Sequence, residues 1–363
     1  MAVETAQRPA LSRQIGLPRH TVSDLLANLE SRGLVQTSGD LGGLPGRSQL
    51  TYALRPSAAL SLGFDIGGTK VAGALCDIRG TILAEQLEPT AQTGAAALVE
   101  QIAAMADRLC RDAGLPRFQV RNTAIGVPAA VHPQTGALTL AGNLPGLEDP
   151  GLADRLSQAL GGKLHLDNDV NLALLAELAH GVAQGRSNVI FIALGTGIGA
   201  ALMIDGHLLR GAFGGAGEIG YTPLWQLDPA GTPSLENRVG EAGIRQHYVA
   251  LGGDAAHTVR DIFDAAVAGE AAATAALDTA AETVVRALVA ALSLVDPDLV
   301  VFGGSIGARS EFIDRIRTNV SAAWMRPVDV LRSKAGGRAG LLGALELSRQ
   351  NMLEDLFGAR PVR

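Results

Sequence analysis

Cysteine, aromatic residues and long apolar runs are all scarce in this sequence. Only two cysteines occur, Cys76 and Cys110, which are too few for a disulfide framework and lack the spacing of metal ligands. No run approaches the roughly 20 apolar residues of a membrane-spanning helix, and the opening MAVETAQRPALSRQ lacks the apolar core of a secretion signal. We therefore expect a reduced, cytoplasmic protein with no membrane partner.

An excess of positive charge is also missing. The formal net charge is −6, which excludes a protein that coats nucleic acid through a broadly basic surface. A small local DNA site is still compatible with the charge, because the first 60 residues carry six arginines and four acidic residues.

The residues that are abundant are typical of a globular α/β protein. Hydrophobic residues make up 47% of the 363 positions and aromatic residues only 4%, so Ala, Val, Leu and Ile must form the core. A chain of this length exceeds one ordinary core, which predicts two or three domains. From about residue 60, strands alternate with helices, which predicts parallel sheets with right-handed crossovers.

The N-terminal segment has its own pattern. Residues 11–35 follow a helical periodicity that Gly16 interrupts and that Gly33 is expected to cap. Two helices joined by a glycine-containing turn are typical of a helix-turn-helix, but an ordinary helical hairpin gives the same pattern, and both interpretations stay open. The candidate DNA-binding residues are Arg19, His20, Thr21 and Ser23 in the second helix and Arg47 in a Gly-, Ser- and Pro-rich loop at 37–49, before an apolar strand at 50–54.

A glycine turn in GFDIGGTK follows an apolar strand. Because Gly67 and Gly68 lack side chains, their backbone N–H groups can approach an anion, while Thr69 and Lys70 add a hydroxyl and a cation. Most Gly-Gly turns are plain hairpins. Asp65 favours the phosphate-site interpretation here, since an aspartate beside a phosphate can handle a metal ion or a water molecule.

Two further glycine clusters follow apolar strands. Gly195, Thr196 and Gly197 repeat the first arrangement about 130 residues later, which predicts two similar lobes facing one nucleotide. Gly303 and Gly304 either lie near the base or ribose of that nucleotide or form a simple strand-to-helix turn.

A polar cluster lies between the first two loops. Residues 163–166 are predicted to form a strand and residues 170–180 a helix, with Asp167, Asn168 and Asp169 at the carboxyl end of the strand. Functional residues of open α/β sheets gather at such ends. Capping of the helix by Asn168 or Asp169 explains the same pattern.

Taken together, these segments resemble the ROK family of sugar kinases and sugar-responsive repressors, within the larger actin, hexokinase and heat-shock chaperone ATPase fold. The resemblance runs from about Leu11 to the C-terminus and is carried by GFDIGGTKVAGAL, AIGVPAAVHPQTG, AGNLPGLEDPGLADRL, LDNDVNLALLAELAHG, LGTGIGAALMIDG and GAFGGAGEIGY. It implies an α/β, two-lobed actin/hexokinase-like ATPase fold preceded by a truncated winged helix-turn-helix. The implied domains are 1–57 for the partial winged helix-turn-helix with its wing, 58–165 plus a C-terminal helix at 338–357 for the first lobe, and 166–337 for the second lobe.

The resemblance also implies roles for individual residues. Asp169 matches the catalytic base, which takes the proton from a sugar hydroxyl as that oxygen attacks the γ-phosphate of ATP. The residues expected to contact ATP, its phosphates or Mg²⁺ are Asp65, Gly67, Gly68, Thr69, Lys70, Gly195, Thr196, Gly197, Gly303 and Gly304. The residues expected to contact the sugar are Asn143, Asn168, Asp169, Glu218, Tyr221 and Glu236.

The sequence departs from the family pattern at two places. Family members with a zinc signature have a histidine three residues after the glutamate that matches Glu218, followed by a cysteine-rich stretch, but this chain has Tyr221 and no cysteines there. We therefore expect no structural zinc. At the N-terminus the match begins only at about Arg8, without the first helix of roughly ten residues that closes a winged domain. Either the natural start lies upstream or this domain is degenerate.

Two functions stay open. The helix-turn-helix and wing favour a sugar-responsive transcriptional regulator that binds operator DNA. The alternative is an ATP-dependent kinase for a hexose or an N-acetylhexosamine, because both glycine loops and Asp169 are intact. A homodimer or higher homo-oligomer is expected from the resemblance, and the apolar helix at 271–295 could lie in the core or in an interface.

Overall fold

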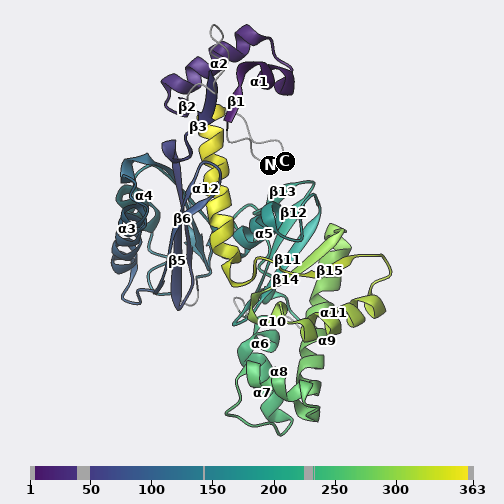
Figure 1. Ribbon diagram of the computed structural model, residues 1–363. Coiled ribbons are helices and arrows are strands. Elements are labelled where there is room, and N and C mark those ends of the chain that lie inside the picture. The colour runs from purple at the N-terminus through teal and green to yellow at the C-terminus, as the bar shows by residue number, and fades with distance from the viewer. Residues whose placement is uncertain (1–4, 39–49, 142–143, 225–231, 233, 359–363) are drawn as a thin grey trace.

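The computed structural model describes residues 5–38, 50–141, 144–224, 232 and 234–358, which form an N-terminal unit and two larger lobes (Figure 1). The C-terminal helix α12 (Ala339–Phe357) runs between these parts, with the N-terminal unit at one end and a lobe on either side. Within the described ranges, no helix is both long and apolar enough to cross a bilayer.

In residues 5–38 and 50–54, the N-terminal unit has two helices and a three-stranded antiparallel sheet with the order β1-β3-β2. Its elements are β1 (Thr5–Gln7), α1 (Arg8–Ile15), α2 (Arg19–Ser31), β2 (Val35–Ser38) and β3 (Thr51–Leu54). Val22 and Leu26 of α2 pack with Tyr52 of β3 in a small core.

The predicted helical segment 11–35 is too long at its C-terminal end, because Val35 lies in strand β2 and not in a helix. Helix α2 ends at Ser31, where Gly33 adopts the left-handed conformation with φ 70°. The N–H groups of Gly33 and Leu34 donate to the carbonyls of Glu30 and Leu29 at 2.9 Å each, which closes the helix in the pattern expected for a capping glycine.

The first lobe is built on a five-stranded sheet with the order β10-β7-β4-β5-β6. Strands β7 and β10 run parallel to β4, whereas β5 and β6 follow it as antiparallel hairpins. Side chains alternate between the faces, so Leu62 and Phe64 pack against α3 and α4 while Ala74 packs against Leu341 of α12. The elements are β4 (Leu60–Ile66), β5 (Lys70–Asp77), β6 (Ile82–Pro89), α3 (Ala95–Asp112), β7 (Val120–Val127), α4 (Leu152–Leu160) and β10 (Lys163–Asn168), with a small hairpin of β8 (Ala130–Val131) and β9 (Leu138–Thr139).

The second lobe contains another five-stranded sheet, with the order β13-β12-β11-β14-β15. Ile190 and Ile192 face a core formed with α9, while Val189 and Phe191 face helix α5. The elements are α5 (Asp169–His180), β11 (Val189–Leu194), β12 (Ile198–Ile204), β13 (His207–Leu209), α6 (Glu236–Val239), α7 (Glu241–Ala250), α8 (Val259–Val267), α9 (Ala271–Val295), β14 (Leu299–Gly303), α10 (Gly304–Gly307), α11 (Ser310–Ala323) and β15 (Asp329–Arg332). The inner side of α9 therefore belongs to the core of this lobe.

The two lobes meet where α12 crosses α5. Gly343 allows this close approach, since a Cβ atom at this position would overlap the carbonyl of Leu172. The fully buried carboxylate of Glu177 ties α5 to the segment that leads from β15 into α12. Its Oε1 accepts hydrogen bonds from Ser333 Oγ at 2.6 Å and from the N–H of Ala335 at 2.8 Å, and its Oε2 accepts from the N–H of Val182 at 2.8 Å.

Candidate functional site

The first glycine loop is the hairpin turn between β4 and β5. Within it, the N–H of Gly67 donates to the carbonyl of Lys70 at 2.9 Å. The loop is held from outside by Thr90 Oγ1, which donates to the carbonyl of Gly67 at 2.7 Å, and by Gln92 Nε2, which donates to the carbonyl of Gly68 at 2.8 Å. Neither supporting residue was predicted from the sequence, because both lie more than 20 positions away and form no motif with the loop.

The second glycine loop is the equivalent turn between β11 and β12. The N–H of Gly195 donates to the carbonyl of Gly197 at 2.9 Å, and the N–H of Glu241 donates to the carbonyl of Gly195 at 3.0 Å. Glu236 lies against this turn, where its Oε2 accepts from the N–H of Ile198 at 3.2 Å. A Cβ atom at Gly197 would overlap that carboxylate. The structure thus gives Glu236 a contact with the loop, while its contact with a sugar stays a prediction.

The third glycine pair lies beside the second loop. Gly303 ends β14, and Gly304, with φ 82°, begins the short helix α10, so the pair does form a strand-to-helix turn. A Cβ atom at Gly304 would overlap the carbonyl of Leu194, and one at Gly195 would lie 2.9 Å from Ser305 Oγ. The turn therefore packs directly on the second loop, and its contact with a nucleotide stays a prediction.

The junction between β10 and α5 carries Asp167, Asn168 and Asp169. Asn168 is the residue that caps the helix, because its Oδ1 accepts from the N–H groups of Val170 at 2.9 Å and Asn171 at 3.3 Å. Its Nδ2 also donates to the carbonyl of Ala129 at 3.1 Å. These bonds fix the Asn168 amide, and its contact with a sugar stays a prediction.

Asp169 is half-buried at the start of α5, and its Oδ1 accepts from the N–H of Val170 at 2.9 Å. The pKa of this carboxyl is raised to about 7. Burial is the largest cause, and the negative charges of Asp65 and Glu218 add to it. A group with a pKa near neutrality can both accept and release a proton at physiological pH.

Asp65 is the second acidic group of the site and lies at the carboxyl end of β4. Burial raises its pKa to about 6, with partial compensation by the positive charge of Lys70. A Cβ atom at Gly340 would lie 2.5 Å from Asp65 Oδ2, so this glycine leaves the space beside the carboxylate open. A carboxylate whose charged form is disfavoured by burial is an oxygen donor suited to a hard cation such as Mg²⁺, so Asp65 is the candidate ligand.

The loop that carries Glu218 and Tyr221 is anchored to β12 and to the following segment. The N–H of Ala200 donates to the carbonyl of Gly217 at 2.8 Å, and the N–H of Leu235 donates to the carbonyl of Gly220 at 3.0 Å. Burial and then the charge of Glu236 raise the pKa of Glu218, and burial and then Glu218 raise the pKa of the partly exposed Tyr221 phenol.

An ion pair that sequence reasoning missed ties this loop to the site. Asp167 is almost fully buried and accepts from Arg210 at 2.6 Å and 3.0 Å through the guanidinium Nη2 and Nε. Asn171 Nδ2 donates to the other carboxylate oxygen of Asp167 at 2.9 Å. Arg210 stands directly before the glycine-rich loop, and no motif pairs it with Asp167 in the sequence.

The remaining residues of interest lie apart or outside the described part of the chain. Arg19 and His20 are exposed in the first turn of α2, where Thr21 and Ser23 are half-buried. Asn143 and Arg47 lie outside the described residues. Residues 225–231 and 233 lie outside them as well, so the expected absence of zinc stays a prediction from the sequence.

Comparison with known proteins places this architecture in one family. The ROK family profile matches residues 61–351. The bifunctional enzyme NanE/NanK of Brucella melitensis is 32% identical over 306 residues, which are 83% of this chain, and the chain spans 56% of the length of that relative. A ROK glucokinase from Streptomyces griseus, solved with glucose and AMPPNP, is 28% identical and covers 80% of this chain and 100% of its own, with a TM-score of 0.67.

The similarity to one further solved structure includes the N-terminal unit. A ROK family transcriptional regulator, a homologue of the E. coli MLC protein, is 21% identical and covers 97% of this chain and 93% of its own, with a TM-score of 0.76. The expectation of an α/β, actin/hexokinase-like architecture is confirmed by these matches. This chain belongs to the ROK family.

Proposed function

We propose that this protein is an ATP-dependent sugar kinase that phosphorylates a hydroxyl of a hexose or an N-acetylhexosamine. The observation that carries the proposal is the half-buried carboxyl of Asp169, which directly follows β10, senses the charges of Asp65 and Glu218, and has a pKa of about 7. A glucokinase among the similar structures, solved with glucose and AMPPNP, supports a sugar substrate and the use of ATP.

In this proposal Asp169 is the general base. It takes the proton from the reacting sugar hydroxyl while that oxygen forms a bond to the γ-phosphorus and the bond to the ADP oxygen breaks. The proton ends on Asp169, and ADP leaves with the electron pair of the broken bond. Glu218 and Tyr221 hold other sugar hydroxyls together with Asn143, Asn168 and Glu236.

The phosphates of ATP lie between the two hairpin turns. The first turn contributes Gly67, Gly68, Thr69 and Lys70, whose positive side chain balances the phosphate charge. Asp65 would hold Mg²⁺, which would shield negative charge on the phosphates. The other contacts come from the second and third turns and are made by Gly195, Thr196, Gly197, Gly303 and Gly304.

The test is ADP release with ATP and Mg²⁺ across hexoses, N-acetylhexosamines and pentoses. Asp169→Asn should lower kcat by about 10²- to 10⁴-fold, the contribution of a general base. Glu100→Gln, which alters an exposed carboxylate of α3, is the matched control and should leave kcat unchanged. The proposal fails if no tested sugar is turned over although one of them binds, or if Asp169→Asn retains full activity.

A second candidate function is favoured by the N-terminal unit. We also propose that this unit is a partial winged helix-turn-helix, so that the chain acts as a sugar-responsive regulator with α2 in the major groove of operator DNA. Two helices followed by the β2–β3 hairpin support this interpretation, as does the regulator fold that spans 97% of the chain. Arg19, His20, Thr21, Ser23 and Arg47 would contact the DNA, and a two-fold dimer would suit a palindromic site.

DNA binding is tested by fluorescence anisotropy with duplexes from the protein's own promoter region at two salt concentrations. A true site should prefer those duplexes over scrambled ones and weaken as salt increases. Arg19→Gln should reduce the affinity, whereas Arg111→Gln, on an exposed position of α3, should not. Equal binding to scrambled DNA, or equal loss in both variants, would exclude this function for the N-terminal unit.

A further inference from the structure

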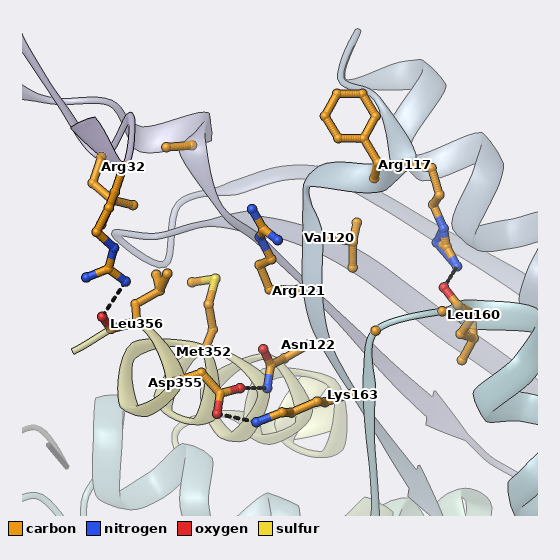
Figure 2. A pocket seen from close by; sticks show the side chains of 15 residues that line it. Arg32, Arg117, Val120, Arg121, Asn122, Leu160, Lys163, Met352, Asp355 and Leu356 are labelled. Carbon is orange, nitrogen blue, oxygen red and sulfur yellow. Dashed lines mark hydrogen bonds and ion pairs between the residues drawn. The ribbon is translucent and has the colours of Figure 1, made fainter. Parts of the chain in front are cut away.

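A cavity of about 1050 Å³ lies at the opposite end of the first sheet from the candidate site (Figure 2). Its lining includes the first residues of β7 and β10, whereas Asp65 lies near the carboxyl end of β4 and Asp169 directly follows the carboxyl end of β10. The N-terminal unit contributes Arg32, and α12 contributes Asp355. The cavity is therefore shared by the N-terminal unit, the first lobe and the C-terminal helix, and no residue of the candidate site lines it.

The lining of this cavity is strongly cationic. Four basic side chains, Arg32, Arg117, Arg121 and Lys163, face a single acidic one, Asp355. Asp355 forms an ion pair with Lys163 and accepts from Asn122 Nδ2 at 3.2 Å, so it neutralises only one of the four. Figure 2 shows this pair on one side of the space and the three guanidinium groups spread across the rest of it.

The three arginines keep most of their charge uncompensated. Arg32 and Arg117 each donate through Nη2 to a backbone carbonyl at 2.6 Å, which orients the guanidinium without neutralising it. The Nε and Nη1 atoms of Arg117 are buried without a hydrogen bond, and its ion pair with the exposed Asp107 is long at 3.8 Å. No described residue forms a hydrogen bond or ion pair with the side chain of Arg121.

We infer that this cavity is a binding site for a small phosphorylated metabolite, recognised through its phosphomonoester group. Guanidinium groups match phosphate oxygens in geometry and charge, and buried N–H donors without partners gain most from such a ligand. The volume exceeds that of a phosphate ion and is in the range of small-metabolite pockets. The exposed Phe118 ring at its edge offers an apolar surface for the remainder of the ligand.

A sugar phosphate is the natural probe, because the proposed kinase reaction would produce this class of compound. A ligand held between Arg32 and the first lobe would add a contact between the N-terminal unit and that lobe. The binding measurement itself needs no turnover, so its failure is distinguishable from failure of the proposed kinase function.

The experiment is isothermal titration of the full chain with inorganic phosphate and with a hexose 6-phosphate at constant ionic strength. Arg121→Gln should weaken binding about tenfold or more, since it removes one charge-assisted contact without breaking a bond within the protein. Arg111→Gln is the control for the loss of one exposed positive charge. Lys70→Gln should bind normally, because the phosphate loops of the nucleotide site lie elsewhere.

Each result decides the inference. Stronger binding of the hexose 6-phosphate supports a sugar phosphate as the ligand, and equal affinity for both probes supports phosphate itself. The inference is overturned if neither probe binds at millimolar concentration, if Arg121→Gln binds as the unaltered protein does, or if Lys70→Gln abolishes binding.

Discussion

Asp169→Asn should stabilise the ligand-free protein even as it removes the catalytic base. The folded protein holds the proton of Asp169 more tightly than the unfolded chain does, because its pKa rises from 3.8 to about 7 on folding. Ionising the group therefore destabilises the folded state. This cost is absent near pH 4, grows as the pH rises toward 7, and is fully present above pH 7.

The size of the effect follows from the same values. Each pKa unit corresponds to about 1.4 kcal/mol, and part of the rise is shared with Asp65, so we expect the carboxylate to cost about 2–4 kcal/mol at pH 8. Asparagine has nearly the same shape and carries no charge. The substitution should therefore raise the free energy of unfolding by that amount at pH 8 and by little at pH 4, a difference of several degrees in Tm.

The assay is thermal unfolding of both proteins from pH 4 to pH 8, without nucleotide or sugar. Glu100→Gln in α3 serves as the control, since this exposed carboxylate has no buried environment to relieve. The reasoning is refuted if Asp169→Asn raises Tm equally at pH 4 and pH 8. It is also refuted if the substitution lowers Tm at pH 8.

Three further substitutions test the supporting contacts. Glu177→Gln places an N–H donor where Oε2 now accepts a hydrogen bond, so the free energy of unfolding in urea should fall by about 2–4 kcal/mol, while the exposed Glu282→Gln should change nothing. Gly343→Ala should lower the free energy of unfolding by at least about 1–3 kcal/mol, because the added methyl group clashes with α5. An unchanged urea midpoint would show that α12 and α5 can move apart without a loss of stability. Thr90→Val removes the hydroxyl that holds the Gly67 carbonyl, so the free energy of unfolding should fall by about 1 kcal/mol and ATP affinity about tenfold, and equal ATP titrations would mean that the loop needs no such support.

The sequence allowed prediction of those features whose cause is local. Gly33 ends α2 because only a residue tolerant of positive φ fits the cap, and the run from Lys163 to His180 divides into strand and helix at its polar residues. The Gly67 and Gly195 turns form hairpins because each lies directly between two apolar strands that pair with one another. In each case the residues that decide the structure lie within a few positions of one another.

Features that depend on distant partners could not be predicted in this way. Thr90 and Gln92 support a loop more than 20 residues earlier, and Arg210 pairs with Asp167 across 43 positions. Strand β1 is only three residues long and exists because it pairs with β3, so no periodicity marks it. Val35 continued the helical pattern by chance, although its pairing with Leu54 makes it part of a strand.

Helix α12 limits how a ligand between the lobes could influence the N-terminal unit. Leu34 and Ala59 pack in one cluster with Met352, and Met352 also accepts a hydrogen bond from Ser61 of β4 at 3.4 Å, so the N-terminal unit, α12 and the first sheet form one packed body. The crossing at Gly343 joins this body to α5 and the second lobe. Closure of the lobes around a sugar would therefore move the second lobe relative to all three parts together. A regulator built in this way can change the spacing of two N-terminal units only if its two copies are joined through their second lobes, because a dimer joined through the first lobes would keep that spacing fixed.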